Sequence, residues 1–122
     1  MVAGNRIKNF EDLDVWKNAL QFAVSIYRSS ENFPKAELFA LTSQLRRAGS
    51  SISANIAEGF GRRTNKDKIH FYTIAYGSTL EVKNFLYLSS ELGYIDRSRL
   101  DILLSESIVI QKQLNSLVRS LS

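Results

Sequence analysis

Apolar side chains recur every three or four positions along most of the chain, the spacing of one buried face of an α-helix. The clearest stretch runs from Leu38 to Arg63, where we expect one amphipathic helix. Its apolar seam consists of Leu38, Leu41, Leu45, Ala48, Ile52 and Ile56. The sustained alternation of apolar and polar residues that indicates strands is missing from the sequence. The chain is therefore predicted to be all-α.

The first helix is predicted to begin near Asp12 or Asp14 and to stop before residues 29–34. Its inward face is expected to carry Trp16, Leu20, Ala23 or Val24, and Tyr27. Pro34 cannot extend this helix but can open the next one. The glycines of 59–61 are expected to close the second helix in the left-handed conformation.

A third helix is predicted over residues 66–92, after a capping pair of Thr64 and Asp67. Apolar residues fall on two sides of it, one with Ile69, Tyr72, Tyr76, Leu80, Leu86 and Tyr87, and the other with Ile74, Phe85, Leu88 and Leu92. A single bundle buries only one of these faces fully, so the second face predicts an oligomer interface. We also expect Gly77 to permit a close approach of this helix to a neighbour.

The last helix is expected to follow a second capping pair, Ser98 with Asp101, and to run to the C-terminus. Its seam consists of Leu100, Leu103, Ser107, Ile110, Leu114, Leu117 and Leu121. Short connections between four such helices predict an antiparallel up-and-down four-helix bundle. We expect one domain over residues 1–122, with residues 1–10 flexible.

A second, polar pattern lies beside the seam of the second helix and consists of Glu37, Gln44, Ser51, Asn55 and Glu58. Short hydrogen-bonding groups of this kind suit partly buried pairing between helices or subunits. We expect a structural network that also includes Arg46, Ser78 and Glu81. Because Arg46 and Arg47 point to different sides of the helix, at least one can pair with a glutamate of this network. A recognition surface is the alternative interpretation.

The length of 122 residues suits one domain, and the absence of cysteine excludes thiolate metal sites and disulfides within the chain. The N-terminal sequence lacks the apolar core of a signal peptide, and no segment approaches the length of a membrane span. We therefore expect a soluble cytoplasmic protein that does not contact membranes.

The formal charge of +4 arises entirely between Lys35 and Lys83, since the two flanking segments are each balanced. A cluster of cations lies at a predicted loop and helix start, where the helix dipole opposes them. An anionic partner such as a phosphate backbone would favour this placement. The candidate nucleic-acid-binding residues are Arg62, Arg63, Lys66, Lys68 and Arg47. A solubilising surface is the simpler alternative.

Catalytic chemistry finds little support in the sequence. His70 is the only histidine and lacks the partners that acid–base catalysis requires. A carboxylate-bridged metal site in a bundle needs a histidine three residues after a glutamate, and neither Glu58 nor Glu81 has one. We therefore predict a non-enzymatic protein without metal or cofactor. An enzyme is kept only as a third hypothesis.

The motifs in chain order resemble the 23S ribosomal RNA intervening-sequence protein family, also called the four-helix bundle protein family. The residues that carry the resemblance lie between about 10 and 95. They are Phe10 with Asp12, Leu13, Val15 and Trp16, then Phe33-Pro34 with Glu37 and Leu41, Gln44-Leu45-Arg46-Arg47-Ala48, Ser51-Ile52, Ala54-Asn55-Ile56-Ala57-Glu58-Gly59, and Ala75, Gly77, Ser78 and Glu81.

This resemblance implies an up-and-down bundle that assembles into a ring-shaped homopentamer. Proteins similar to this family accompany reverse transcriptases of diversity-generating retroelements as basic, nucleic-acid-associated accessory subunits. The leading hypothesis is therefore a non-catalytic oligomeric adaptor that binds RNA or DNA. The alternative is a protein–protein scaffold for a partner such as a nearby-encoded polymerase, without direct contact to nucleic acid.

Overall fold

The computed structural model describes residues 7–122, and within this range it contains helices and no strand. The four long helices are α1 (Asp14–Ser29), α2 (Leu41–Phe60), α3 (Asn65–Glu91) and α4 (Arg97–Leu121). Two short 3₁₀ helices, Phe10–Asp12 and Lys35–Glu37, precede α1 and α2.

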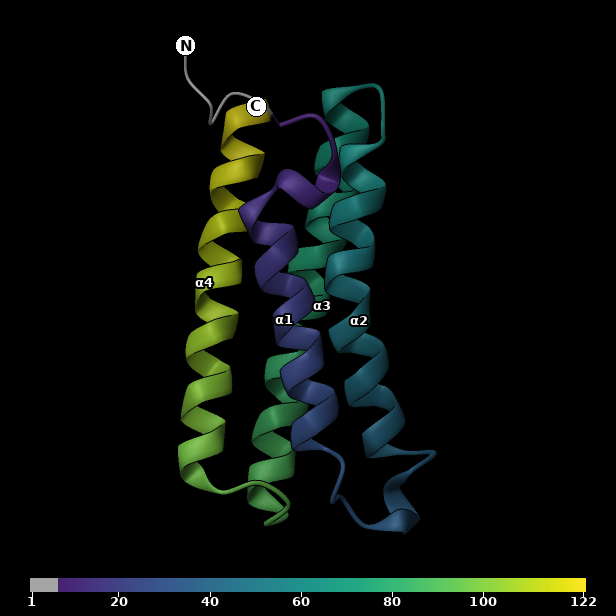
Figure 1. The fold of residues 1–122 in the computed structure, drawn as a ribbon, viewed down its shortest axis with the longest axis vertical. Coiled ribbons are helices and arrows are strands. Elements are labelled where there is room, and N and C mark those ends of the chain that lie inside the picture. The colour runs from purple at the N-terminus through teal and green to yellow at the C-terminus, as the bar shows by residue number, and fades with distance from the viewer. Residues whose placement is uncertain (1–6) are drawn as a thin grey trace.

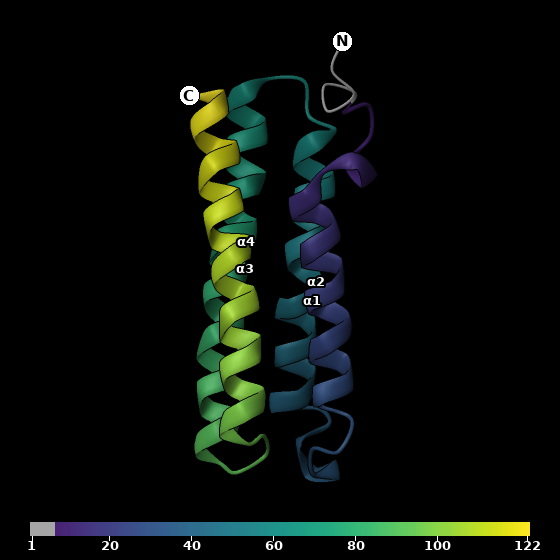
Figure 2. The same cartoon turned by 60° about the vertical axis from the view of Figure 1, so that its left-hand side comes forward.

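The helices form one antiparallel bundle in which each packs against its two neighbours, in the cyclic order α1, α2, α3, α4 (Figure 1). Figure 2 shows that α4 ends and α1 begins at the end of the bundle where α2 connects to α3. The predicted all-α, up-and-down four-helix architecture is confirmed. Residues far apart in the sequence, at 62–68 and near 121, are therefore brought to one end.

The predicted seams of α2 and α4 form the centre of the core. In α2, Leu41, Leu45, Ala48, Ile52 and Ile56 are buried. In α4 the buried positions are Leu100, Leu103, Ser107, Ile110 and Leu114, while Leu117 and Leu121 pack at the edge of the core. Burial of these side chains is the main stabilising contribution to such a bundle.

The predicted inward face of α1 is correct only in part: Ala23 is buried and Trp16 packs at the edge of the core. Its buried residues are Val15, Ala19, Phe22, Ala23 and Ile26. Leu20 and Tyr27, which the sequence placed inside, are 38% and 45% exposed. The segment has two overlapping apolar stripes. The stripe that contains Ala19 and Ala23 is buried, because small side chains allow close approach to the other helices.

The start of α2 also differs from the prediction, because the helix begins at Leu41 and not at Leu38. Ala40 has φ −125° and ψ −107°, which interrupts the helical path, and Leu38 is 48% exposed. Glu37 partly replaces the missing cap by accepting a hydrogen bond from the backbone N–H of Leu41 at 3.4 Å. Pro34 opens only the short helix before this break.

The helix ends show two further differences. Gly61 closes α2 with a right-handed backbone, φ −77°, so the predicted left-handed closure is wrong there. Thr64 caps α3 as predicted, accepting a hydrogen bond from the Asp67 backbone at 3.1 Å. The N-cap of α4 is Asp96, which accepts from the Arg99 backbone at 2.7 Å. Ser98, the predicted cap, lies inside the helix.

The buried face of α3 is made mainly of small residues, which the prediction from bulky side chains missed. Tyr72 and Leu86 are buried as expected, but Leu80 and Tyr87 are about half exposed. The other buried positions are Ala75, Ser78, Thr79, Val82 and Ser89. Small side chains let α3 lie close to α2, and this proximity determines which face turns inward.

Residues 1–6 lie outside the described part of the chain, so the predicted flexibility of residues 1–10 stays a prediction. The ring of Phe10 packs edge-on against the Trp16 ring, with centroids 5.0 Å apart.

Candidate nucleic-acid interface and interhelical polar network

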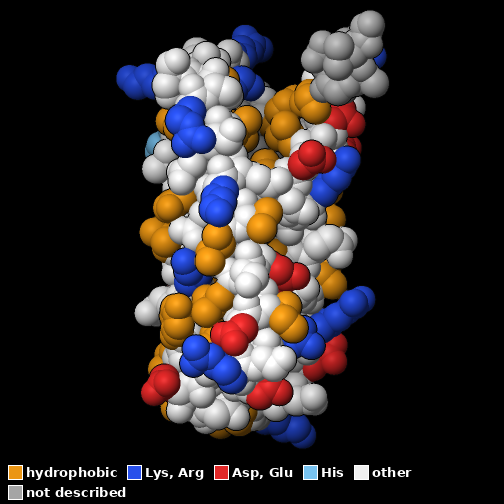
Figure 3. Space-filling view, turned by 90° about the vertical axis from the view of Figure 1, so that its left-hand side faces the viewer, with side chains coloured by type: hydrophobic (Ala, Val, Ile, Leu, Met, Phe, Trp, Pro, Cys, Tyr) orange, Lys and Arg blue, Asp and Glu red, His pale blue; other side chains and the backbone are white. Residues whose placement is uncertain are grey.

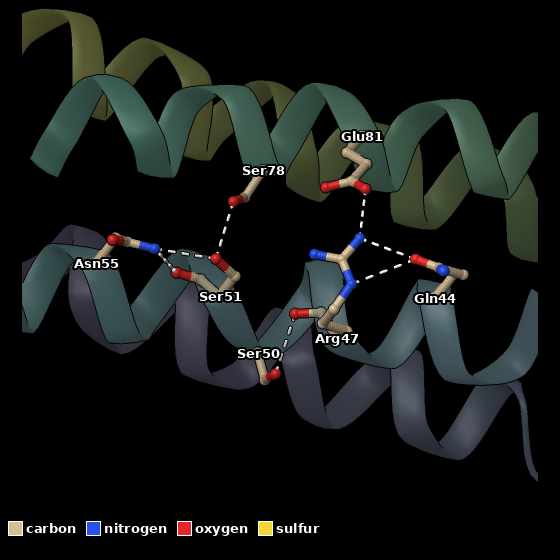
Figure 4. A network of polar contacts seen from close by, with 7 residues as sticks. All are labelled: Gln44, Arg47, Ser50, Ser51, Asn55, Ser78 and Glu81. Carbon is tan, nitrogen blue, oxygen red and sulfur yellow. Dashed lines mark hydrogen bonds and ion pairs between the residues drawn. The ribbon is translucent and has the colours of Figure 1, made fainter. Parts of the chain in front are cut away.

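Five of the predicted network residues meet along the contact between α2 and α3 (Figure 4). The hydroxyls of Ser51 and Ser78 are 3.0 Å apart, one donating to the other across the two helices. Asn55 donates from Nδ2 to the Ser51 carbonyl at 2.8 Å and to the Ser51 hydroxyl at 2.9 Å. This end of the network is half-buried, where satisfied polar groups specify helix pairing.

The other end of the network is an ion pair between Arg47 on α2 and Glu81 on α3. Arg47 also donates to the Gln44 side-chain oxygen from Nε at 3.2 Å and from Nη2 at 3.0 Å. Its side chain is 54% exposed and that of Glu81 is 38% exposed, so water screens the pair. An exposed pair of this kind links α2 to α3 but adds little to stability.

Three residues predicted for this network lie elsewhere. Arg46 reaches α1, where its Nε donates to the Ser30 hydroxyl at 2.9 Å and its Nη2 donates to the Tyr27 carbonyl at 3.2 Å. Glu37 accepts the Tyr94 phenol at 2.8 Å and links the start of α2 to the α3–α4 connection. This hydrogen bond to a carboxylate raises the pKa of Tyr94. Glu58 pairs with Arg62.

The basic residues 62–68 gather where α2 passes into α3, at one end of the bundle. Two of them have partners within the chain. Arg62 Nη2 lies 2.6 Å from Glu58 Oε2, and its guanidinium lies 4.5 Å from the centroid of the Phe71 ring. Lys68 Nζ donates to the Phe60 carbonyl at 2.6 Å. A cation at this C-terminal carbonyl is favoured by the dipole of α2.

The sequence indicated that the helix dipole opposes cations at the start of α3. For Lys68 this argument is weakened, because its ammonium group also lies at the C-terminal end of α2, where the dipole favours it. Arg63 and Lys66 differ from it, because both are exposed and neither makes a hydrogen bond or ion pair with residues 7–122. These two side chains are the ones available to an external anion without breaking an internal contact.

Arg47 does not belong to this basic end. It lies in α2, 13 residues before the last helical residue, Phe60, which is about 20 Å along the axis. Its engagement with Gln44 and Glu81 is a second reason to separate it from the loop cations.

Sequence reasoning missed one basic residue at this end, Arg119. The side chain of Asn65, the first residue of α3, donates to the Leu121 carbonyl of α4 at 3.3 Å. The last turn of α4, which carries Arg119, therefore lies beside the start of α3. Figure 3 shows blue side chains without red ones at the upper left of this face, whereas blue and red side chains are mixed over its lower part. The antiparallel topology was the signal that could have found this residue.

The described residues place the histidine of the sequence on the surface and form no cluster of metal ligands. His70 is exposed, and its ring packs edge-on against Phe71 with centroids 5.3 Å apart. Across residues 7–122 no group of three or more histidine, cysteine, aspartate or glutamate side chains is placed to hold a metal ion. None of the described helices combines the length and apolarity that crossing a membrane requires.

Comparison with known families matches residues 11–116 to the model of the 23S rRNA-intervening sequence protein. The chain belongs to this family. The match includes α1, α2 and α3 in full and α4 as far as residue 116, so the family resemblance inferred from the motifs is confirmed.

A solved structure supports the same assignment. The chain resembles a protein with unknown function from the S23 ribosomal protein family of Bacteroides thetaiotaomicron VPI-5482, with a TM-score of 0.77 and 31% sequence identity. The similarity covers 85% of this chain and 97% of that one. No curated protein matches the chain. The family membership therefore establishes the fold and leaves the activity to be inferred from the residues.

Proposed function

We propose that this member of the 23S rRNA-intervening sequence protein family is a non-catalytic, cytoplasmic, oligomeric adaptor that binds RNA or DNA by phosphate contacts. The observation that carries this proposal is the pair of exposed cations, Arg63 and Lys66, whose side chains have no partner among residues 7–122 at the basic end of the bundle. Arg62 and Lys68 flank them, and the last turn of α4 adds Arg119. Such side chains contact phosphate without reading bases.

The proposed self-association rests on one exposed apolar face of α3. Ile74, Leu88 and Leu92 are 39%, 44% and 48% exposed, although they share one side of a well-formed helix. A face of this kind on a surface helix is typical of a docking site for another chain. The family resemblance implies a homopentamer, in which several weak basic ends would gain avidity.

Binding is tested by fluorescence anisotropy with single-stranded and duplex RNA and DNA, over a range of salt concentrations. Light scattering first fixes the mass of the protein. We expect affinity to fall steeply with salt, because bound cations release counterions from the phosphates. The double variant Arg63→Glu with Lys66→Glu should weaken binding at least about tenfold at low salt.

The matched control reverses the same number of charges at the opposite end, in Arg28→Glu with Lys35→Glu. This control changes the net charge by the same amount and leaves the basic end intact. Both residues are exposed, so the substitutions should not disturb the core. Equal losses in the two double variants would show that only total charge matters. An affinity that does not change with salt concentration would contradict binding through phosphate contacts.

A second candidate function, a protein–protein scaffold, is favoured by the loop before α2. Phe39 is 92% exposed there and Leu38 is 48% exposed, and exposed apolar side chains of this size are typical of protein interfaces. A scaffold for a nearby-encoded polymerase would bind that partner through such residues. Absence of nucleic-acid binding at low salt, together with polymerase binding that Phe39→Ser abolishes, would favour the scaffold over the adaptor.

A further inference from the structure

A pocket between α1 and α4 lies on a different part of the molecule from the basic end and the α2–α3 network. It has a volume of about 180 Å³ and is lined by Asn18, Gln21, Phe22, Glu106 and Val109. This volume accommodates on the order of six water-sized groups. Any ligand that fits it is therefore small.

The most unusual group in this pocket is the Glu106 carboxylate. Its Oε1 atom is buried and receives no hydrogen bond from the described residues. Burial raises the pKa of the Glu106 carboxyl, and the positive charge of Arg99 lowers it only in part. A buried carboxylate oxygen without a donor is energetically costly, so it favours a ligand that brings N–H donors and positive charge.

The remaining walls fit the same chemistry. Asn18 donates from Nδ2 to Gln113 Oε1 at 3.0 Å, which leaves the Asn18 carbonyl oxygen as an acceptor. Two of the lining residues are apolar, the buried Phe22 and Val109, which is 48% exposed. Two oxygen acceptors beside apolar walls suit a cationic head on a short hydrocarbon stem.

We propose that the pocket between α1 and α4 binds a small organic cation, an ammonium or guanidinium group whose N–H bonds are accepted by Glu106. The cation compensates the charge that the protein leaves unpaired, and its stem packs against Val109. Hydrogen bonds between ionised groups are about twice as strong as neutral ones, and exclusion from water strengthens them further. This site is independent of the proposed binding of nucleic acid.

The test is an NMR titration of isotope-labelled full-length protein with ethylguanidinium chloride. Saturable chemical-shift changes are expected at residues of α1 and α4 that line the pocket. Neutral N-ethylurea has nearly the same shape and should produce no saturable change, because it brings no charge to Glu106. Saturation by both compounds would overturn the assignment of a cation site.

Glu106→Gln keeps the size of the side chain and removes its charge, so it should weaken ethylguanidinium binding at least about tenfold. Glu91→Gln, an exposed position in the last turn of α3, removes the same charge outside the pocket and should leave binding unchanged. Equal affinity of wild type and Glu106→Gln would overturn the proposal, as would a chemical-shift change that sodium chloride alone reproduces.

The cation could come from a free small molecule or from an arginine side chain of another protein, and a capped arginine peptide distinguishes these two sources. Binding of ethylguanidinium that the peptide cannot match supports a free small molecule, while tighter binding of the peptide supports an arginine side chain of another protein. Both results support recognition of the cation. Failure of the peptide and of ethylguanidinium together would overturn it, while binding of nucleic acid at the basic end would remain unaffected.

Discussion

Gly59 of α2 lies directly against the ring of Tyr72 on α3. A Cβ atom placed on Gly59 would come within 2.8 Å of Tyr72 Cε1 and 3.0 Å of the Phe71 Cβ. Tyr72 is only 2% exposed, so its ring has little room to move aside. Gly59, which the sequence marked as a helix terminator, therefore allows α2 and α3 to approach closely at the end where the basic residues gather.

Gly59→Ala is expected to destabilise the protein by about 1–3 kcal/mol, the usual cost of inserting a methyl group into a tightly packed contact. Urea unfolding followed by circular dichroism measures this change. Because the α2–α3 corner positions Arg62 and Lys66, the variant should also weaken the proposed nucleic-acid binding.

Gly77→Ala provides the matched control, because nothing lies within 4 Å of a Cβ placed on Gly77. The predicted role of Gly77 in close helix approach is therefore wrong within the chain. Alanine at this exposed position in the middle of α3 should stabilise the helix by about 0.5–1 kcal/mol. Similar losses of stability in both glycine variants would contradict the assignment of the close contact to Gly59.

Lys68 is expected to contribute to stability as well as to charge. Replacement by methionine keeps the aliphatic stem but removes the hydrogen bond to the Phe60 carbonyl, and should cost about 1 kcal/mol of unfolding free energy. Thermal unfolding at low ionic strength measures the difference.

Arg63→Met is the comparison for Lys68→Met, since Arg63 has no internal partner among residues 7–122. It should leave the unfolding free energy within about 0.5 kcal/mol of wild type, while reducing nucleic-acid affinity. The opposite pattern, in which Arg63→Met destabilises the protein and Lys68→Met does not, would reverse their structural and functional roles.

The ion pair of Arg47 and Glu81 should show a coupling energy of about 0.2–1 kcal/mol in a double-mutant cycle with alanine. Both side chains are partly exposed, so salt should reduce the coupling further. A coupling well above this range would mean that the pair is buried by another chain, and light scattering on each variant would test that explanation.

The helices and their seams could be predicted because apolar spacing is a local property of the sequence. The orientation of α1 and α3 could not, since each has two apolar stripes and the choice depends on packing between helices. Ala19 and Ala75 turn inward because small side chains allow close approach, whereas bulk alone favoured Leu20 and Leu80. Which stripe is buried therefore depends on the position of the neighbouring helix.

The candidate sites divide in a similar way. The strip with Ser51 and Asn55 was visible in the sequence because its members share one helix face. Arg119 and Glu106 were not visible, since each acquires its surroundings only when α4 packs beside α3 and α1. Residues contributed by a distant helix require the topology, and an unpaired carboxylate requires the pocket around it.

Glu106 should make the stability of the ligand-free protein fall as pH rises through the acidic range. Its pKa in the folded chain is raised by burial, so the folded state holds the proton above the ordinary glutamate pKa of about 4.3, where the unfolded state has released it. Between these two pKa values the folded state binds more protons, and the unfolding free energy decreases with increasing pH.

Glu106→Gln cannot ionise and should lose this decrease, gaining stability relative to wild type as the pH rises. Urea unfolding on both sides of this window measures the difference, with Glu91→Gln as the control. Parallel curves for wild type and Glu106→Gln would show that the Glu106 carboxylate is fully solvated, and would also remove the basis for the cation pocket.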